Sequence, residues 1–580
     1  MMRVLSSGLA LLLAASYCLA MPPGPAPAPP TPYRITGVVV SRVDGTPIPH
    51  SHLTPSLTQQ RGRGPGRQFP AVPAVEGFDA DEHGRFSIPL PSAGAWQLNA
   101  AAPGYVSQAY DEHQNYSSAI VLTAAAPTID LRFQLSPEAS ITGAVLDEAG
   151  EPVRNARVGL LMEQLSIPER KADSFRPQTF AQTDDRGVYE FANLAPGHYR
   201  VLVEAKPWYA STAQSRRFNS QTSSALSAPP ADPSLDVTYQ LSWYPGVNNA
   251  AEAETIDLHG GDVRRADFHL VPIPAVHLRI LPPPPAEQSG GRVVPAFPVL
   301  ERMDTGIAGL GFAQVAITNG PQGQVDVGGL APGPYRVRLA QQNAETRTAL
   351  VEISDGSARV VDFNAAASSL ANITVNFDNE GTEERPFGLE LIDAETGQQF
   401  FPFGGNHPMP VVMRRGPQTQ QPRESGFEIP PGRYEANFTG RGDAYLTGIS
   451  AQGAEVAGRF VTFQGGDATL TLHMASGHAT VTGIATFDGK PAVGAMVLLV
   501  PAGLDDPGSF TTVVRDQTNT DGSFDLPKIV PGQYILIAID HGWSVNWSDP
   551  ATLRGYLTQG VPLEPRSGAN LRQDITAQAP

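Results

Sequence analysis

Residues 184–199 read DDRGVYEFANLAPGHY, which combines a hairpin turn, a short alternating strand and a Pro-Gly turn that leads into another strand. Pro196 presets φ at the second position of the Pro-Gly turn, and Gly197 tolerates φ > 0 at the third, as a type II turn requires. Tyr199 then begins YRVLV, whose β-branched and aromatic residues favour a pleated, half-buried strand. Alone, this stretch predicts only a turn between two strands.

The same phrase recurs along the chain at intervals of about 100 residues, which is the size of one small domain and too long for a solenoid unit. In each copy a glycine precedes an aromatic residue by two positions: Gly94 and Trp96, Gly197 and Tyr199, Gly333 and Tyr335, Gly432 and Tyr434, and Gly532 and Tyr534. Four copies also carry a glycine ten residues upstream: Gly84, Gly187, Gly323 and Gly522. We interpret all of these as structural turn residues. The glycine before each aromatic, Gly532 included, is expected at φ > 0, and each ring is expected to be buried beside its turn, as in a tyrosine corner.

Composition limits the class of protein and its partners. Glycine (57) and proline (55) are abundant, as expected for many short strands joined by turns. Only 17% of the residues are charged and the net charge is −17, which argues against nucleic acid or an anionic membrane surface, because both require a basic face. A length of 580 residues indicates several domains.

The N-terminus has the pattern of a secretory signal peptide at residues 1–20. Arg3 supplies the positive start, residues 5–15 form a predominantly apolar segment, and small residues precede the expected cleavage after Ala20. A lipoprotein signal around Cys18 is the alternative, although Tyr17 is bulky where that cleavage needs a small residue. Cys18 is the sole cysteine, so we expect no disulfide after cleavage, and no later stretch approaches the ~18 apolar residues of a membrane span.

The repeated phrases set the expected domain boundaries. A proline-rich linker at 21–33 precedes β-sandwich module one at 34–136. Module two at 137–272 carries a polar insertion at 206–238, module three spans 273–367, and the divergent module four spans 368–475. Module five at 476–580 returns to the full pattern. Since no long amphipathic helix is visible, we predict an all-β tandem array of about five Greek-key β-sandwich modules.

Three phrases of module two resemble the carboxypeptidase regulatory-like domain family: TGAV at 142–145, TDDRGVYEF at 183–191 and LAPGHY at 194–199. The resemblance is strongest in modules two and five. It implies a seven-stranded, transthyretin-like (prealbumin-like) sandwich, related in shape to starch-binding-like and collagen-adhesin B-type modules. It also implies a structural or binding module of a secreted bacterial protein, with no catalysis of its own.

No motif predicts a catalytic residue or a cofactor site. Histidine-based zinc motifs, Gly-x-Ser-x-Gly, P-loops and dinucleotide fingerprints are all absent. His50 and His52 could form a metal clip on one strand face, with a solvated loop as the alternative. Asp81, Asp184 and Asp521 stand near turn glycines, where their carboxylates are expected to accept backbone hydrogen bonds. A Ca²⁺ site made by the same oxygens remains an alternative.

Aromatic residues outside the repeated phrase are the candidate ligand-binding residues. They are Trp208, Tyr209, Trp243, Tyr244, Trp543 and Trp547, which lie in or after the insertion of module two and near the end of module five. Exposed aromatic rings in loops can stack on sugar rings. The alternative is an apolar cluster that covers the ends of the sandwiches.

These features predict a secreted, non-catalytic protein of the periplasm, outer surface or extracellular space. We expect it to act in adhesion or scaffolding through surfaces along a roughly linear chain. A polysaccharide-binding protein is the alternative, and a peptidase or hydrolase is a third hypothesis that the name of the family suggests. The expected partners are an extracellular polysaccharide or a surface protein, and the oligomeric state is left open.

Overall fold

The computed structural model describes residues 33–580 apart from several internal segments. The segments outside the description are 59–75, 164–174, 211–231, 283–296, 305–306, 308–309, 311–314, 320–323, 341–346, 355–358, 364–369, 380–387, 396, 398, 401–425, 440–442 and 505–511. The predicted signal peptide, most of the linker and Gly323 therefore lie outside the described residues. The described chain is nearly all β, which confirms the predicted fold class.

Module one is a sandwich of two sheets. The first has the order β4-β1-β8, with β1 at Tyr33–Ser41, β4 at Arg85–Leu90 and β8 at Thr128–Leu135. The second has the order β3-β2-β5-β6 with β7 also on β5; the strands are β2 (His52–Leu57), β3 (Phe78–Asp79), β5 (Gly94–Ala102), β6 (Tyr105–Ala109) and β7 (Ile120–Leu122).

Module two repeats this arrangement. Its first sheet contains β9 (Ala139–Leu146), β12 (Val188–Leu194), β17 (Val263–Arg265) and β18 (Phe268–His269). Its second contains β10 (Arg157–Glu163), β11 (Phe175–Gln182), β13 (Gly197–Glu204), β15 (Ser242–Trp243) and β16 (Ile256–Leu258). A small ribbon pairs β14 (Val237–Tyr239) with β19 (Pro272–Pro274), and two short 3₁₀ turns lie at Pro233–Leu235 and Ala250–Glu252.

Modules three and four are also two-sheet units. In module three, β20 (Val276–Leu281), β22 (Ala316–Asn319), β23 (Val325–Leu330) and β26 (Arg359–Asp362) face β21 (Phe297–Arg302), β24 (Gly333–Ala340) and β25 (Arg347–Ile353). In module four, one sheet holds β27 (Ala371–Asn379), β30 (Gly426–Ile429), β32 (Ala444–Gln452) and β35 (Gly466–Ser476). The other holds β28 (Gly388–Asp393), β29 (Gln399–Phe400), β31 (Gly432–Thr439), β33 (Ala454–Ala457) and β34 (Phe460–Phe463).

Module five adds a helix to the same plan. One sheet holds β36 (Ala479–Phe487), β37 (Lys490–Pro491), β40 (Ser523–Ile529), β43 (Asn570–Arg572) and β44 (Ile575–Thr576). The other holds β38 (Met496–Pro501), β39 (Val514–Gln517), β41 (Tyr534–Ile539) and β42 (Val561–Leu563). Helix α1 (Pro550–Leu557) is capped by Asp549, and its buried Leu553 packs with the outward-facing Leu498 and Ile537 of the second sheet.

All five modules share one strand topology. The opening strand (β1, β9, β20, β27 or β36) lies between the antiparallel strand that ends at the repeated turn and a parallel strand from the end of the same module. Parallel neighbours need a long crossover, which here runs through the opposite sheet. In the opening phrase of module two, an added Cβ at Gly143 would lie 1.9 Å from the Ala266 carbonyl oxygen, so only glycine fits beside the parallel neighbour.

Five hydrophobic cores fill the five sandwiches, and each contains one of the five repeated aromatic residues. These residues are Trp96, Tyr199, Tyr335, Tyr434 and Tyr534. The core residues of each cluster come from a single stretch of chain. We propose that each cluster is the core of one domain with the boundaries expected from the sequence.

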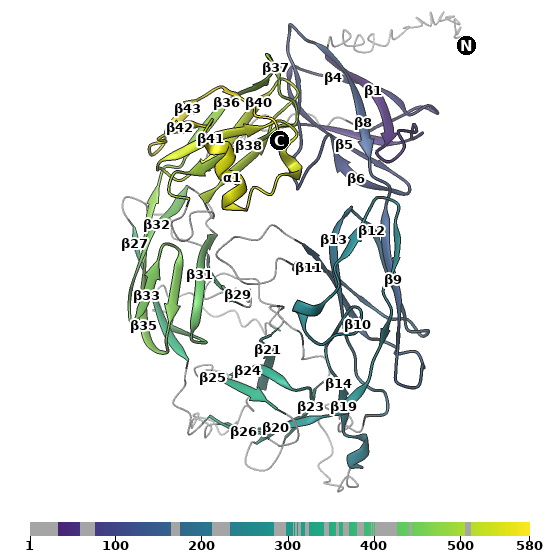
Figure 1. The fold of residues 1–580 in the computed structure, drawn as a ribbon, viewed down its shortest axis with the longest axis vertical. Helices are drawn as coiled ribbons and strands as arrows, with labels where there is room; N and C mark the ends of the chain where they lie inside the picture. The colour runs from purple at the N-terminus through teal and green to yellow at the C-terminus, as the bar shows by residue number, and fades with distance from the viewer. Residues whose placement is uncertain are drawn as a thin grey trace, which may run out of the picture.

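The modules do not form a linear chain. Figure 1 shows them following one another around a closed course, so that module five lies beside module one. Hydrogen bonds join the two modules: the Thr520 amide donates to the Ala119 carbonyl at 3.0 Å, and the Ala119 amide donates to Asn519 Oδ1 at 2.9 Å. The expectation of a roughly linear array is therefore wrong. Asn519 and Thr520 begin module five's copy of the repeated phrase, at the positions of Asp184 and Asp185 in module two, so the contact depends on residues that differ between the copies.

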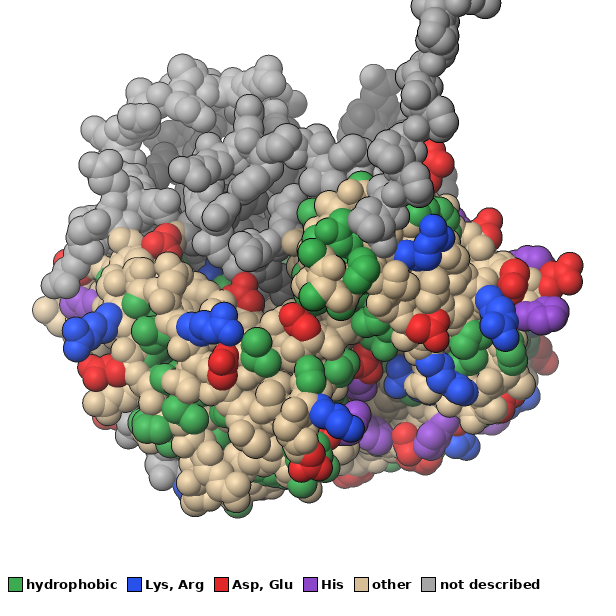
Figure 2. Space-filling view, turned by 90° about the horizontal axis from the view of Figure 1, so that it is seen from above, with side chains coloured by type: hydrophobic (Ala, Val, Ile, Leu, Met, Phe, Trp, Pro, Cys, Tyr) green, Lys and Arg blue, Asp and Glu red, His purple; other side chains and the backbone are tan. Residues whose placement is uncertain are grey.

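The exposed face seen in Figure 2 mixes charges of both signs, with acidic and basic side chains interspersed among polar and apolar ones. Within the described ranges, no helix is both long enough and apolar enough to cross a bilayer.

Candidate functional site

Each repeated turn is an aromatic corner, in which the ring folds back over the turn. The ring donor bonds the carbonyl oxygen four residues earlier in every copy: Trp96 to Ser92 (3.2 Å), Tyr199 to Ala195 (2.8 Å), Tyr335 to Ala331 (3.0 Å), Tyr434 to Pro430 (2.8 Å) and Tyr534 to Val530 (2.8 Å). Burial raises the pKa of Tyr199, Tyr335 and Tyr534, so these phenols stay neutral donors. The recurring aromatics thus hold the fold and are closed to a ligand.

The corner glycines do not share one backbone conformation. Gly197 and Gly532 do not have φ in the left-handed region, so the expectation of φ > 0 at these two positions is wrong. An added Cβ at Gly532 would lie 3.3 Å from Cε2 of Tyr534, and at Gly432 it would lie 3.4 Å from Cε2 of Tyr434. At the corners of modules one and three the expectation is confirmed, since Gly94 has φ 142° and Gly333 has φ 145°. The upstream glycines also have positive φ, such as Gly187 (φ 73°) and Gly522 (φ 79°).

The turn aspartates accept backbone hydrogen bonds, which confirms the expected role. Asp184 Oδ1 accepts from the amides of Val188 (2.8 Å) and Arg186 (2.9 Å), and the Val188 bond is the largest cause that lowers the pKa of Asp184. Asp81 makes the equivalent pair of bonds, and Asp521 accepts from Ser523 at 3.0 Å. Among the described residues, no group of three or more His, Cys, Asp or Glu side chains is arranged to hold a metal ion.

The six candidate aromatics do not share one environment. Trp208 is 85% exposed, and its ring meets that of Tyr209 edge-on at 5.7 Å. The Tyr209 hydroxyl donates to Glu148 Oε1 at 2.5 Å; desolvation and this bond raise the pKa of Tyr209 to about 12. Trp243 is only 3% exposed, inside an apolar cluster that joins Leu202 of module two to Leu310 of module three, and Tyr244 packs against the core of module two.

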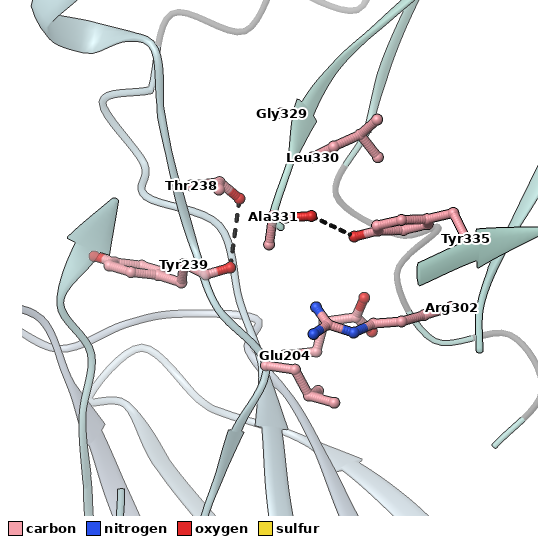
Figure 3. A pocket seen from close by; sticks show the side chains of 9 residues that line it. Glu204, Thr238, Tyr239, Arg302, Gly329, Leu330, Ala331 and Tyr335 are labelled. Atoms are coloured by element: carbon pink, nitrogen blue, oxygen red, sulfur yellow. Dashed lines mark hydrogen bonds between the residues drawn. The ribbon is translucent and has the colours of Figure 1, made fainter. Parts of the chain in front are cut away.

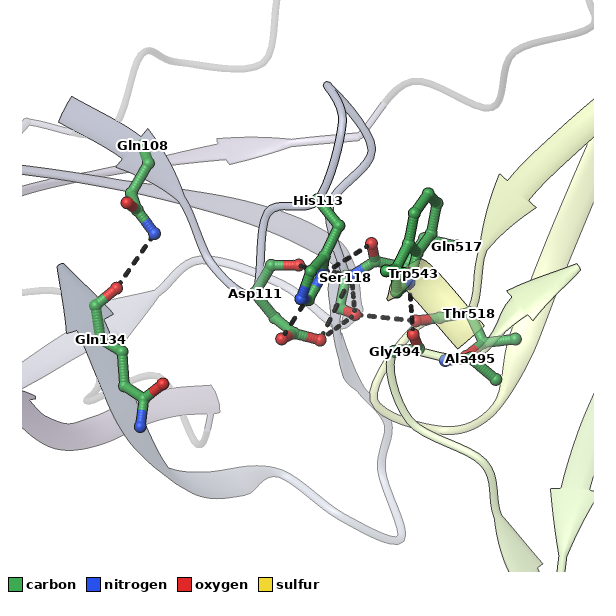
Figure 4. A network of polar contacts seen from close by, with 10 residues as sticks. All are labelled: Gln108, Asp111, His113, Ser118, Gln134, Gly494, Ala495, Gln517, Thr518 and Trp543. Atoms are coloured by element: carbon green, nitrogen blue, oxygen red, sulfur yellow. Dashed lines mark hydrogen bonds and ion pairs between the residues drawn. The ribbon is translucent and has the colours of Figure 1, made fainter. Parts of the chain in front are cut away.

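Trp543 and Trp547 lie at the contact between modules one and five (Figure 4 shows Trp543). Trp543 stacks on His113 of module one at 5.5 Å and donates to the Gly494 carbonyl at 2.8 Å. The Arg515 guanidinium lies 4.1 Å above the Trp547 ring. Of the six, the pair Trp208 and Tyr209 is therefore the one that presents a large exposed aromatic face.

Comparison with known proteins agrees with the geometry of module two. Residues 140–271 match the family model described as the carboxypeptidase regulatory-like domain. This segment is thus similar to carboxypeptidase regulatory-like domains. The exposed aromatic pair Trp208 and Tyr209 follows β13, the strand that begins at the corner.

Solved structures with β-rich folds are similar to the chain at low identity. The Bacillus anthracis TIE protein is 11% identical, with 91% of this chain and 69% of that chain covered and a TM-score of 0.14. GBS52, the minor pilin of Streptococcus agalactiae, is 10% identical, with 42% and 97% covered and a TM-score of 0.19. The streptococcal ancillary pilin is 10% identical, with 57% and 98% covered and a TM-score of 0.18. Similarity at this level says nothing about function. No curated protein matches the sequence.

A small cavity lies where module two meets module three (Figure 3). It has a volume of about 20 Å³ and is lined by Glu204, Tyr239, Arg302 and Tyr335 among others. Arg302 is held by Asp304 through two hydrogen bonds of 2.7 and 2.9 Å. This space suits a single water molecule and is far below the size of a ligand pocket. The cavity is thus part of the junction between two modules.

A Ser-His-Asp hydrogen-bond chain crosses the outer face of module four. His473 Nε2 lies 2.9 Å from Ser450 Oγ, and its Nδ1 lies 3.0 Å from Asp378 Oδ2. No sequence motif predicts these hydrogen bonds, because the three residues lie on the separate strands β27, β32 and β35. The side chains of His473 and Asp378 are 40% and 56% exposed, so water screens the charges that catalysis would need to stabilise. We interpret the chain as a polar ladder between strands.

Proposed function

We propose that the protein is a non-catalytic, exported scaffold that acts in adhesion at the cell surface or in the extracellular space. The observation that carries the proposal is that the recurring aromatic side chains are buried in the cores of the modules. All five aromatic corners are used inside hydrophobic cores, which leaves the surface loops, different in every module, to meet partners. Five sandwiches in one chain then act as a frame that holds unlike surfaces at fixed distances.

Attachment of the producing cells tests the adhesion function. Cells that lack the gene should attach less to a solid support than the parent, and the full-length chain should restore attachment. The surface fraction should contain the protein with Met21 as its first residue, as the predicted signal cleavage requires. Equal attachment of parent and deletion strain would contradict the proposal.

The absence of catalysis can be tested at Ser450. A fluorophosphonate probe labels serines that a neighbouring base activates. We expect no labelling of the full chain, because the Ser450–His473–Asp378 ladder is open to water. The Ser450→Ala variant serves as the control. Labelling that disappears in this variant would show an activated serine and would contradict the non-catalytic function.

A polysaccharide ligand is the second candidate, favoured by the exposed face of Trp208. Affinity electrophoresis in gels that contain different polysaccharides should show retardation that is lost in Trp208→Ala. The matched control is Tyr209→Phe, which keeps both rings and removes only the bond to Glu148. Unretarded migration of the wild-type chain in every gel would exclude this candidate.

A further inference from the structure

Modules one and five meet through two unlike surfaces. Module one contributes residues 110–121, from the end of β6 into β7, and module five contributes residues 515–520 together with Trp543. Figure 4 shows Asp111, His113 and Ser118 of module one beside Gln517, Thr518 and Trp543 of module five. Ser118 and Thr518 are both buried in this contact, and the Ser118 hydroxyl donates to the Thr518 carbonyl at 2.8 Å. The Val121 amide donates to Thr520 Oγ1 at 2.9 Å. Backbone groups of module one are thus satisfied by module five.

Gln517 stands at the centre of the contact and is only 1% exposed. Its Nε2 donates to the Asp111 carbonyl at 2.5 Å and to Ser118 Oγ at 2.9 Å, and its Oε1 lies 3.3 Å from His113 Nδ1. A buried amide whose donors and acceptor are all matched fixes the register of two surfaces. The contact is therefore specific.

Aromatic and cationic groups surround this polar centre. The Arg515 guanidinium lies between the rings of Tyr116 (5.1 Å) and Trp547 (4.1 Å) and donates to Gln114 Oε1 at 2.9 Å. Buried aromatic and arginine side chains around hydrogen-bonded groups are typical of interfaces between separate proteins.

The two surfaces are not joined by adjacent chain. At the other four junctions the chain itself passes from one module to the next, whereas the bonds of this contact join residues about 400 positions apart, as for Ser118 and Thr518. The pair of surfaces is heterologous, since the two sides are different. Such a pair closes on itself within one body or joins successive bodies head to tail.

We propose that this contact is also an interaction surface between copies of the chain, in which module one of one copy binds module five of the next. Within one chain the surfaces are held at a high effective concentration, so the closed form is favoured in dilute solution. Crowding at a cell surface, or tension on the two ends, favours exchange between neighbours. The proposal holds whatever ligand the loops bind.

Two full-length variants test the exchange by complementation. Ser118→Arg breaks the surface on module one, and Gln517→Arg breaks the surface on module five; each variant keeps the other surface intact. Each alone should sediment as a monomer that is more extended than the wild type. Their mixture should form a 1:1 dimer through the two intact surfaces, and it cannot grow further. Wild-type chain, closed on itself, should join either variant far less.

Circular dichroism confirms that both variants are folded before mixing. If either fails to fold, His113→Ala and Arg515→Glu provide a milder pair on the same two surfaces. A doubled mass in the mixture, absent from each variant alone, supports the proposal. A mixture that stays at monomer mass at the highest soluble concentration overturns it and leaves the contact as an intramolecular clasp only.

Discussion

Two glycines of module five act through different physical constraints, so their substitution should have different effects. Gly522 has φ 79°, and an added Cβ would lie 2.5 Å from the backbone oxygen of Ala485. Gly532 has no left-handed φ, and its added Cβ would meet only the Tyr534 ring edge at 3.3 Å. We expect Gly522→Ala to destabilise module five by roughly 2 kcal/mol or more, and Gly532→Ala by roughly 1 kcal/mol or less. Calorimetry of the full chain measures both, and equal losses would contradict the assignment.

The corner hydrogen bond should have a measurable effect in every module. Tyr534→Phe removes the hydroxyl that bonds the Val530 carbonyl at 2.8 Å and keeps the ring in place. The expected loss is about 1 kcal/mol, the usual net value of a neutral hydrogen bond. Tyr434→Phe makes the same change at Pro430 and should cost a similar amount in module four. Phe variants with unchanged melting would show that only the ring matters.

Between elements, charge holds β21 to β24 in module three and links this module to module four. Glu301 accepts from Arg336 Nε at 2.8 Å and from Arg338 at 2.6 Å, and the Arg336 guanidinium lies 4.4 Å from the Phe400 ring of module four. Burial acts to raise the pKa of Glu301, but attraction by Arg336 and Arg338 prevails and lowers it below 4.5.

This lowered pKa has a definite consequence for stability against pH. The contribution of ionised Glu301 is fully present above the ordinary pKa of 4.5 and is lost as the pH falls through the lowered value. Glu301→Gln should therefore melt well below the wild type at neutral pH, and the difference should vanish in acid. The exposed Glu352→Gln on β25 is the control. A pH-independent difference between wild type and Glu301→Gln would contradict the ion-pair account.

The elements that the sequence predicts well are those built from repeated backbone chemistry. In module two, the phrase TGAV lies in the opening strand β9 and the phrase LAPGHY forms the corner before β13. Helix α1 was not expected. It is short and buries Leu553 against the second sheet of module five, so its apolar face is recognisable only when that sheet is known. The conformation of Gly197 was also predicted wrongly, since a Pro-Gly pair suggests a type II turn and the structure has no left-handed φ at this position.

At the scale of the whole molecule, the residues that differ between the copies determine the arrangement. Trp543 and Trp547 were considered for sugar stacking on sequence alone. The structure stacks Trp543 on His113 of module one and places Trp547 against Arg515, whose guanidinium bonds Gln114 of module one. Tryptophans in loops look alike in a sequence whether they face solvent or another domain. The two cases can be told apart only when one knows whether residues about 400 positions away in the sequence lie beside the tryptophan, as residues of modules one and five do here. No local sequence pattern gives this information.

Closure of the chain should be visible as protection of module one by module five. The amides of Ala119 and Val121 donate to Asn519 and Thr520, so they can exchange with solvent only when the contact opens. In Gln517→Arg, hydrogen exchange in a peptide covering 110–121 should become faster by at least tenfold, which corresponds to ~1.4 kcal/mol of lost protection. A peptide from β8 in the same module is the control, because its amides bond β1 within module one. Faster exchange in both peptides would mean that module one itself is destabilised, and unchanged exchange in 110–121 would mean that the contact does not close in solution.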